Sequence, residues 1–128
     1  MQALERILYA EDEPDIQQIA SLALEVVGGF SLKICESGLV ALAEIEAFKP
    51  QLLLFDVMMP DMDGPTALEK IREMEAYRDT PAVFMTAKVQ PNEVQRYLDM
   101  GAVDVIAKPF DPMTLASQIQ TIWERIEG

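Results

Sequence analysis

Short apolar or alternating runs and longer amphipathic segments follow one another five times along this chain, and this alternation limits the fold more than any other feature. The short runs have strand length, whereas the longer segments carry apolar residues at helical spacing. Strands are expected at 7–10, 30–34, 52–55, 82–85 and 103–107, and helices at 14–27, 37–48, 65–77, 92–100 and 111–127. Strands and helices that alternate with short connections predict an α/β fold with a parallel sheet.

The polarity of each strand indicates its place in the sheet. Residues 52–55 are apolar on both faces, as a central parallel strand must be, and residues 7–10 and 82–85 have a similar pattern. The strands at 30–34 and 103–107 carry polar residues, which suit edge positions. With right-handed crossovers, this pattern predicts a doubly wound, flavodoxin-like sheet in the order 2-1-3-4-5, with five helices on both faces.

The composition narrows the class of protein. At 128 residues, half of them hydrophobic, the chain suits one domain with its own core. Its net charge of −12 argues against direct nucleic-acid binding, which needs clustered lysine and arginine. No apolar run approaches the about 20 residues that span a bilayer, and no signal peptide precedes the first strand. We therefore expect a cytoplasmic protein in which Cys35, the only cysteine, is a buried structural thiol.

Polar side chains gather where four of the five expected strands end. They are Glu11 and Asp12 after the first strand, Asp56 after the third, Thr86 after the fourth and Lys108 after the fifth. Because the carboxyl ends of parallel strands share one edge of a sheet, these residues should meet in one crevice. Three carboxylates there repel one another unless a cation or a proton intervenes. Mg²⁺ prefers such oxygen ligands, and a chain with no histidine and one cysteine lacks the ligands for a histidine- or thiolate-bound metal.

A carboxylate in this position can also attack phosphorus and form an acyl phosphate. That reaction needs a metal near the incoming oxygens, a cation that balances the phosphoryl charge, and a hydroxyl donor. Asp56 as nucleophile, a metal on Asp12, the ammonium of Lys108 and the hydroxyl of Thr86 fill these roles. The residues therefore predict a magnesium-dependent phosphoacceptor.

Four segments make the whole chain resemble the receiver domain of two-component response regulators, in particular the chemotaxis-regulator type. They are the apolar strand with its acidic pair at 7–14, the loop DVMMPDMDG at 56–64, MTA at 85–87 and KPF at 108–110. The resemblance implies that Asp56 is the phosphorylation site and that Thr86 and Lys108 contact the phosphoryl oxygens. It also implies that Glu11, Asp12, Asp56 and the backbone carbonyl of Met58 hold Mg²⁺.

The same resemblance implies several further features. Lys108 and Pro109 are expected to be joined by a cis peptide, and Gly64 to adopt a backbone conformation that other residues resist. Residues 1–128 are expected to form one receiver domain, with no output domain in this chain. The phosphodonor would be a sensor histidine kinase or a histidine phosphotransfer protein. The domain would catalyse only its own phosphorylation and dephosphorylation, so it would not be an enzyme.

The resemblance places the output face on helix four, strand five and helix five, at about residues 92–127. This face would bind a downstream target or output domain, and many receivers also form homodimers through it. Most of its apolar residues should belong to the core, and Trp123 is the candidate for an exposed interface residue.

Two residues depart from the family pattern or bear on the phosphoryl lifetime. Val105 stands where receivers often carry an aromatic ring that moves together with Thr86, and valine is stiff and short. We therefore expect switching without the aromatic step. Met58 is apolar and cannot orient an attacking water, which predicts slow self-dephosphorylation.

Three other functions share parts of this pattern. An aspartyl-phosphate hydrolase typically has a second acid two residues after its nucleophile, where this chain has Met58. A nucleotide-binding flavodoxin-type protein would need a glycine-rich phosphate loop, which the sequence lacks. A receiver-like interaction module that is never phosphorylated stays open because of Val105, although the complete set of site residues argues against it.

Overall fold

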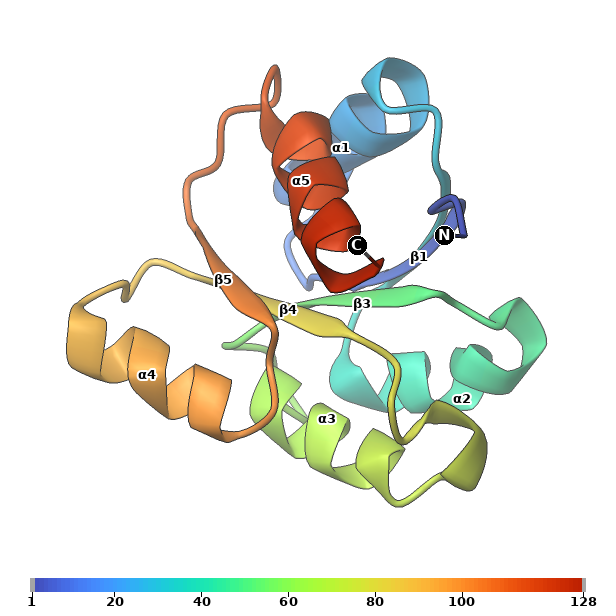
Figure 1. Cartoon of the computed structure of the whole chain (residues 1–128), viewed down its shortest axis with the longest axis vertical. Helices are drawn as coiled ribbons and strands as arrows, with labels where there is room; N and C mark the ends of the chain where they lie inside the picture. The colour runs from blue at the N-terminus through green and yellow to red at the C-terminus, as the bar shows by residue number, and fades with distance from the viewer. Residues whose placement is uncertain (1, 128) are drawn as a thin grey trace.

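Five parallel strands form the central sheet of the computed structural model, which describes residues 2–127 (Figure 1). They are β1 (Arg6–Ala10), β2 (Ser31–Cys35), β3 (Leu52–Asp56), β4 (Ala82–Thr86) and β5 (Asp104–Ala107). The observed order, β2-β1-β3-β4-β5, confirms the predicted doubly wound topology. The strand order reverses between β1 and β3, so a crevice forms beyond the carboxyl ends of these two strands.

The helices are arranged in two layers. They are α1 (Pro14–Ser21), the π-helix η1 (Leu22–Val27), α2 (Gly38–Phe48), α3 (Gly64–Arg72), the 3₁₀-helix η2 (Glu75–Tyr77), α4 (Pro91–Asp99) and α5 (Leu115–Glu127). α1 and α5 cover one face of the sheet, whereas α2, α3 and α4 cover the other (Figure 1). None of the helices within residues 2–127 is both long and apolar enough to cross a membrane.

Each face of the sheet has its own apolar core. Because side chains alternate along a strand, Ile7 and Tyr9 of β1 pack towards α1 and α5, whereas Leu8 packs on the opposite side. β3 and β4 are buried along their whole length, and the edge strands β2 and β5 are partly exposed, as predicted. On the second face, the rings of Phe84 and Tyr97 meet edge to face at 5.5 Å, which fixes α4 against β4.

One helix changes its geometry along its length, and the boundaries of two others differ from the expectation for local reasons. The first helix changes from α to π geometry at Leu22 before it ends at Gly28 and Gly29. The third ends at Arg72, because the backbone N–H groups of Glu73 and Met74 form shorter turns before η2 begins. The last begins only at Leu115, because the Asp111 carboxylate accepts a hydrogen bond from the backbone N–H of Met113 and holds a turn there.

Trp123 is buried, so the prediction that it is an exposed interface residue is wrong. Its side chain is only 3% exposed, and its indole N–H donates a 2.7 Å hydrogen bond to the backbone carbonyl of Gln2. It therefore holds the N-terminal segment against α5 and is not an exposed interface residue. Met100, Met113 and Ile126 are large hydrophobic residues of this region that are exposed. Cys35 is buried as expected, and burial raises the pKa of its thiol to about 11.

Candidate functional site

The polar residues predicted at the strand ends meet at one edge of the sheet. Glu11 directly follows β1, Asp56 and Thr86 are the last residues of β3 and β4, and Lys108 directly follows β5. Glu11, Asp56 and Thr86 are buried although they are polar, with 0%, 4% and 4% of their surfaces exposed. Burial of this kind is costly for a charged group unless it is paired. The contacts of these residues therefore decide what the site can do.

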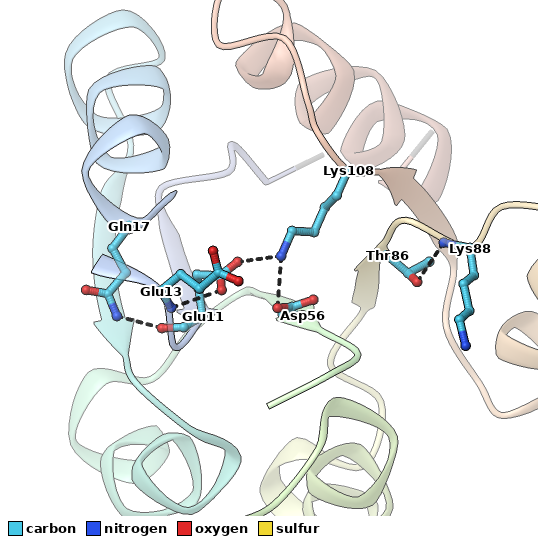
Figure 2. A network of polar contacts seen from close by, with 7 residues as sticks. All are labelled: Glu11, Glu13, Gln17, Asp56, Thr86, Lys88 and Lys108. Carbon is cyan, nitrogen blue, oxygen red and sulfur yellow. Dashed lines mark hydrogen bonds and ion pairs between the residues drawn. The ribbon is translucent and has the colours of Figure 1, made fainter. Parts of the chain in front are cut away.

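Lys108 joins the two most buried carboxylates (Figure 2). Its ammonium donates one hydrogen bond of 2.9 Å to Glu11 Oε1 and another of 3.0 Å to Asp56 Oδ2. We call Glu11, Asp56 and Lys108 the acid–lysine cluster. Two carboxylates share one ammonium, so the cluster carries one uncompensated negative charge when all three groups are ionised. It is therefore prepared to receive a further cation.

The shared ammonium affects the ionisation of both partners. Burial raises the pKa of Asp56 from 3.8 to about 6, while the hydrogen bond from Lys108 acts against this rise and the charge of Glu11 adds to it. Burial alone would lower the pKa of Lys108, but its hydrogen bonds to Glu11 and Asp56 outweigh burial and raise it. Near neutral pH, Asp56 is therefore ionised and Lys108 is protonated, which is the state that a nucleophilic carboxylate and a charge-balancing cation require.

The backbone and side chain of Glu11 are held by contacts that the sequence analysis missed (Figure 2). Its Oε2 accepts a hydrogen bond from the backbone N–H of Glu13, and the amide of Gln17 donates a 2.6 Å bond to its backbone carbonyl. Its own N–H donates to the carbonyl of Cys35. Gln17 lies in the first turn of α1, which starts directly beyond the strand end. Its place in that turn is the one feature of the sequence that could have identified Gln17 as a residue of the site.

Asp12 completes an acidic group with Glu11 and Asp56. One carboxylate oxygen from each lies within 4.8 Å of the others. Asp12 is partly exposed, so the group is open to solvent on one side. An all-oxygen donor set that holds one negative charge beyond its lysine fits a hard divalent cation such as Mg²⁺. The side chain of Met58 is 71% exposed and lines the same hollow as Asp56.

Thr86 and Lys108 are linked through their backbones on the far side of Asp56. The N–H of Lys108 donates to the carbonyl of Thr86, and the hydroxyl of Thr86 accepts a 3.1 Å bond from the N–H of Lys88 (Figure 2). Lys108 and Pro109 are joined by a cis peptide, as the resemblance implies. The end of β4 and the start of the segment after β5 therefore bring Thr86 and Lys108 to the same edge of the sheet as Asp56.

Gly64 supports Asp56 for a reason other than the one expected. Positive φ angles occur at Gly29 and Gly101 among the described glycines, so Gly64 does not adopt a left-handed conformation. A Cβ at Gly64 would instead collide with the backbone carbonyl oxygen of Asp56. The N–H of Gly64 also donates to the carbonyl of Val57. The glycine is needed for close approach of α3 to the end of β3.

A cavity of about 440 Å³ opens from the site towards α4. Asp56, Thr86 and Lys108 line one part of it. Arg96, Tyr97 and Met100 line the part at α4, so one hollow connects the strand ends with that helix. A group bound to Asp56 would therefore have room, and a path to the helix, without any rearrangement of the core.

Comparisons with known proteins agree with this geometry. Residues 7–120 match the response regulator receiver domain family. The chain is 31% identical over 94% of its length to the transcriptional regulatory protein TrcR of Mycobacterium tuberculosis, and 31% identical over 96% to the DNA-binding response regulator MtrA of Mycolicibacterium smegmatis. It covers 46% and 52% of those two proteins, so it spans about half the length of these curated relatives.

A solved structure shows the same fold across the domain. The chemotaxis response regulator CheY4 of Vibrio cholerae superposes with a TM-score of 0.86 at 28% identity, covering 94% of this chain and 99% of CheY4. Because the family model covers most of the chain and the strand order, strand-end residues and structural relative agree with it, this protein belongs to the response regulator receiver domain family.

Proposed function

We propose that this receiver domain accepts a phosphoryl group on Asp56 from a sensor histidine kinase or a histidine phosphotransfer protein in a Mg²⁺-dependent reaction. The observation that carries the proposal is the pair of hydrogen bonds from Lys108 to Asp56 and Glu11 at the opening of a cavity. A surface aspartate would not need a buried ammonium beside it. A phosphoacceptor does, because the incoming group brings negative charge.

In this reaction an Asp56 oxygen attacks phosphorus, a P–O bond to the carboxylate forms, and the bond from phosphorus to the donor breaks. Glu11, Asp12, Asp56 and the backbone carbonyl of Met58 would hold the Mg²⁺. When bound, the ion offsets negative charge on the phosphoryl oxygens. The clustering of three carboxylates within 4.8 Å supports this assignment. The ionised state of Asp56 near neutral pH leaves its lone pairs free for attack.

Lys108 and Thr86 would bind the transferred group. The ammonium of Lys108 already contacts the carboxylate that is to be modified, so a small shift brings it to a phosphoryl oxygen. Thr86 Oγ1 accepts a hydrogen bond from Lys88 and keeps its own proton for donation. Movement of Thr86 towards the phosphoryl group would change the shape of the cavity that Thr86 and Tyr97 both line.

The switched surface would be the α4–β5–α5 face, which would bind a downstream target, an output domain or a second copy of the chain. Val105 packs half-buried on β5, so we propose that the face switches without the swing of an aromatic ring there. Methyl NMR of Val105 with and without a phosphoryl analogue tests this. A rotamer change of Val105 that accompanies movement of Thr86 would contradict it.

The domain itself would act in the cytoplasm as a signalling module, with autocatalytic phosphorylation and dephosphorylation as its only chemistry. The net charge of −12 supports partners other than nucleic acid for this domain. The DNA-binding named for MtrA is stated of a protein about twice as long. The second candidate function is an interaction module that is never phosphorylated, which Val105 favours.

Intact-mass measurement separates the two candidates. The full chain is incubated with Mg²⁺ and a small acyl phosphate, beside Asp56→Asn and the neighbouring control Asp61→Asn. A gain of about 80 Da, one phosphoryl group, in the native protein and Asp61→Asn alone is the expected result. Absence of both the gain and Mg²⁺ binding would contradict the proposal and favour the unphosphorylated module.

A further inference from the structure

The hydroxyl of Tyr9 is an unexplained polar group beside the site. Tyr9 lies in the middle of β1 with none of its surface exposed, packed in the core that α1 and α5 cover. Within residues 2–127, its hydroxyl is the one buried side-chain N or O atom without a hydrogen-bond partner. Buried hydroxyls are nearly always paired, because leaving one unpaired sacrifices the hydrogen bonds it makes to water in the unfolded chain. A phenylalanine would fill this position without that cost.

The neighbour that can use this hydroxyl is Glu11. It follows Tyr9 by two residues, so the two side chains project to the same side of the sheet. Burial raises the pKa of Tyr9 most, and the charges of Glu11 and Asp56 raise it further. The hydroxyl therefore keeps its proton beside a carboxylate, although no formed hydrogen bond joins the two groups.

Glu11 depends on a donor that has a second task. Its buried carboxylate accepts hydrogen bonds from Lys108 at 2.9 Å and from the backbone N–H of Glu13 at 3.2 Å. A carboxylate offers about four acceptor positions, so it can take another donor. If Lys108 moves to a phosphoryl group on Asp56, Glu11 loses the one charged donor that it has within residues 2–127 while it stays buried. The Tyr9 hydroxyl is a buried donor without a partner, two residues from Glu11 along the same strand face.

We propose that Tyr9 is a positioning residue, whose hydroxyl donates a hydrogen bond to the Glu11 carboxylate when Lys108 turns from Glu11 to the phosphoryl group on Asp56. This rests on the proposed role of Lys108 in phosphoryl binding. The ring of Tyr9 is fixed by core packing, whereas the longer side chain of Glu11 can adjust by rotation about its χ angles. Exchange of one donor for another would keep Glu11 ordered, and ready to hold Mg²⁺, in both states of the domain.

Tyrosine NMR tests the exchange without metal or phosphodonor. The chain has three tyrosines, so a full-length sample labelled at tyrosine Cζ gives three signals, which Tyr9→Phe, Tyr77→Phe and Tyr97→Phe assign. Lys108→Met removes the competing donor from Glu11, and Lys88→Met is the control because Lys88 lines the same cavity. The Tyr9 signal should move in Lys108→Met and stay in place in Lys88→Met. Adding Tyr9→Phe should lower the melting temperature more in the Lys108→Met background than in the native one.

Metal binding gives a second readout in the native chain, which keeps the test valid if Lys108→Met does not fold. Mg²⁺ with beryllofluoride, a phosphoryl analogue, should move the Tyr9 signal. With beryllofluoride present, Tyr9→Phe should weaken Mg²⁺ binding roughly tenfold, as loss of a group that orients a metal ligand does, whereas Tyr77→Phe should not.

The outcomes separate this proposal from the proposed function. An unmoved Tyr9 signal in folded Lys108→Met, or with bound Mg²⁺ and beryllofluoride, would overturn the role of Tyr9 and leave the phosphoacceptor assignment intact. Failure of the native chain to bind Mg²⁺ and beryllofluoride at all would overturn both.

Discussion

Ion pairs occur both in the acid–lysine cluster and on the α4–β5–α5 face, but they differ in burial. In the cluster, the side chains of Lys108 and Glu11 are 15% and 0% exposed and their charged atoms lie 2.9 Å apart. On the face, Arg125 and Asp104 lie 3.2 Å apart, but their side chains are 59% and 34% exposed. The two ion pairs have similar lengths, but the pair in the cluster is buried and the pair on the face is exposed to solvent.

This difference indicates how the domain divides its tasks. Buried charges interact strongly, and removal of the ammonium that Glu11 and Asp56 share leaves both carboxylates unpaired. Solvated charges interact weakly and can be replaced at little cost. We therefore expect that substitutions in the cluster disturb the domain strongly, whereas substitutions on the face are tolerated and can suit different partners. Four substitutions test this contrast, in order of decreasing effect.

Lys108→Met should have the largest effect on stability. It leaves Glu11 and Asp56 buried without their shared cation, and loss of one partner from a buried pair costs about 3–5 kcal/mol. Urea unfolding at neutral pH measures this free energy. Lys88→Met, which removes a lysine from the same cavity, is the control and should change stability little. Equal effects of the two substitutions would remove the basis of the comparison.

Gly64→Ala should come next, because it acts on the backbone that carries Asp56. The added Cβ would collide with the carbonyl oxygen of Asp56, and overpacking of this kind costs about 1–3 kcal/mol. We expect reduced stability together with slower phosphorylation of Asp56, measured by unfolding and by intact mass. Thr66→Ala, at an exposed position two residues further along α3, should leave both unchanged. A fully stable and active Gly64→Ala would contradict the close-packing explanation.

Asp56→Asn should stabilise the metal-free domain by about 2 kcal/mol at about pH 8, since it removes a buried carboxylate that the fold disfavours in its charged form. The pKa of Asp56 is raised from 3.8 to about 6, chiefly by burial. Its contribution to stability is therefore fully present below pH 3.8 and is lost as the pH rises through about 6. The advantage of the variant should shrink between these two values as the pH falls. A stability difference in favour of Asp56→Asn that grows towards low pH would contradict this prediction.

Arg125→Ala should have the smallest effect, below about 1 kcal/mol, because exposed ion pairs contribute little. The same unfolding experiment at high salt checks the reason, since salt should leave the native chain and the variant almost equal in stability. A loss as large as that of Lys108→Met would show that the face is no more tolerant than the cluster.

The sequence was sufficient for the parts of the fold that follow from simple periodicity. The strand order followed from which strands are apolar on both faces, and Asp56, Thr86 and Lys108 could be brought together because parallel strands end at one edge. The helix ends were less predictable. The turn at Asp111 and the π geometry from Leu22 depend on local backbone hydrogen bonds that no sequence period records.

Contacts between distant segments could not be predicted either. Trp123 was predicted to be exposed because the partner that buries it, the backbone carbonyl of Gln2, lies 121 residues away in the sequence. Lys108 donates to Glu11, 97 residues away in the sequence, and no sequence period records this pairing. The orphaned hydroxyl of Tyr9 was hidden within an apolar strand pattern.

Mapping of the phosphorylated residue tests the central claim most directly. The chain is treated with Mg²⁺ and a phosphodonor, the acyl phosphate is reduced with borohydride, and the peptides are sequenced by mass spectrometry. Reduction converts a phosphorylated aspartate into homoserine, so the modified position can be read along the chain. We predict homoserine at position 56 and unmodified residues at Glu11 and Asp12. Modification at Asp12 in place of Asp56, with Asp56 intact, would contradict the account.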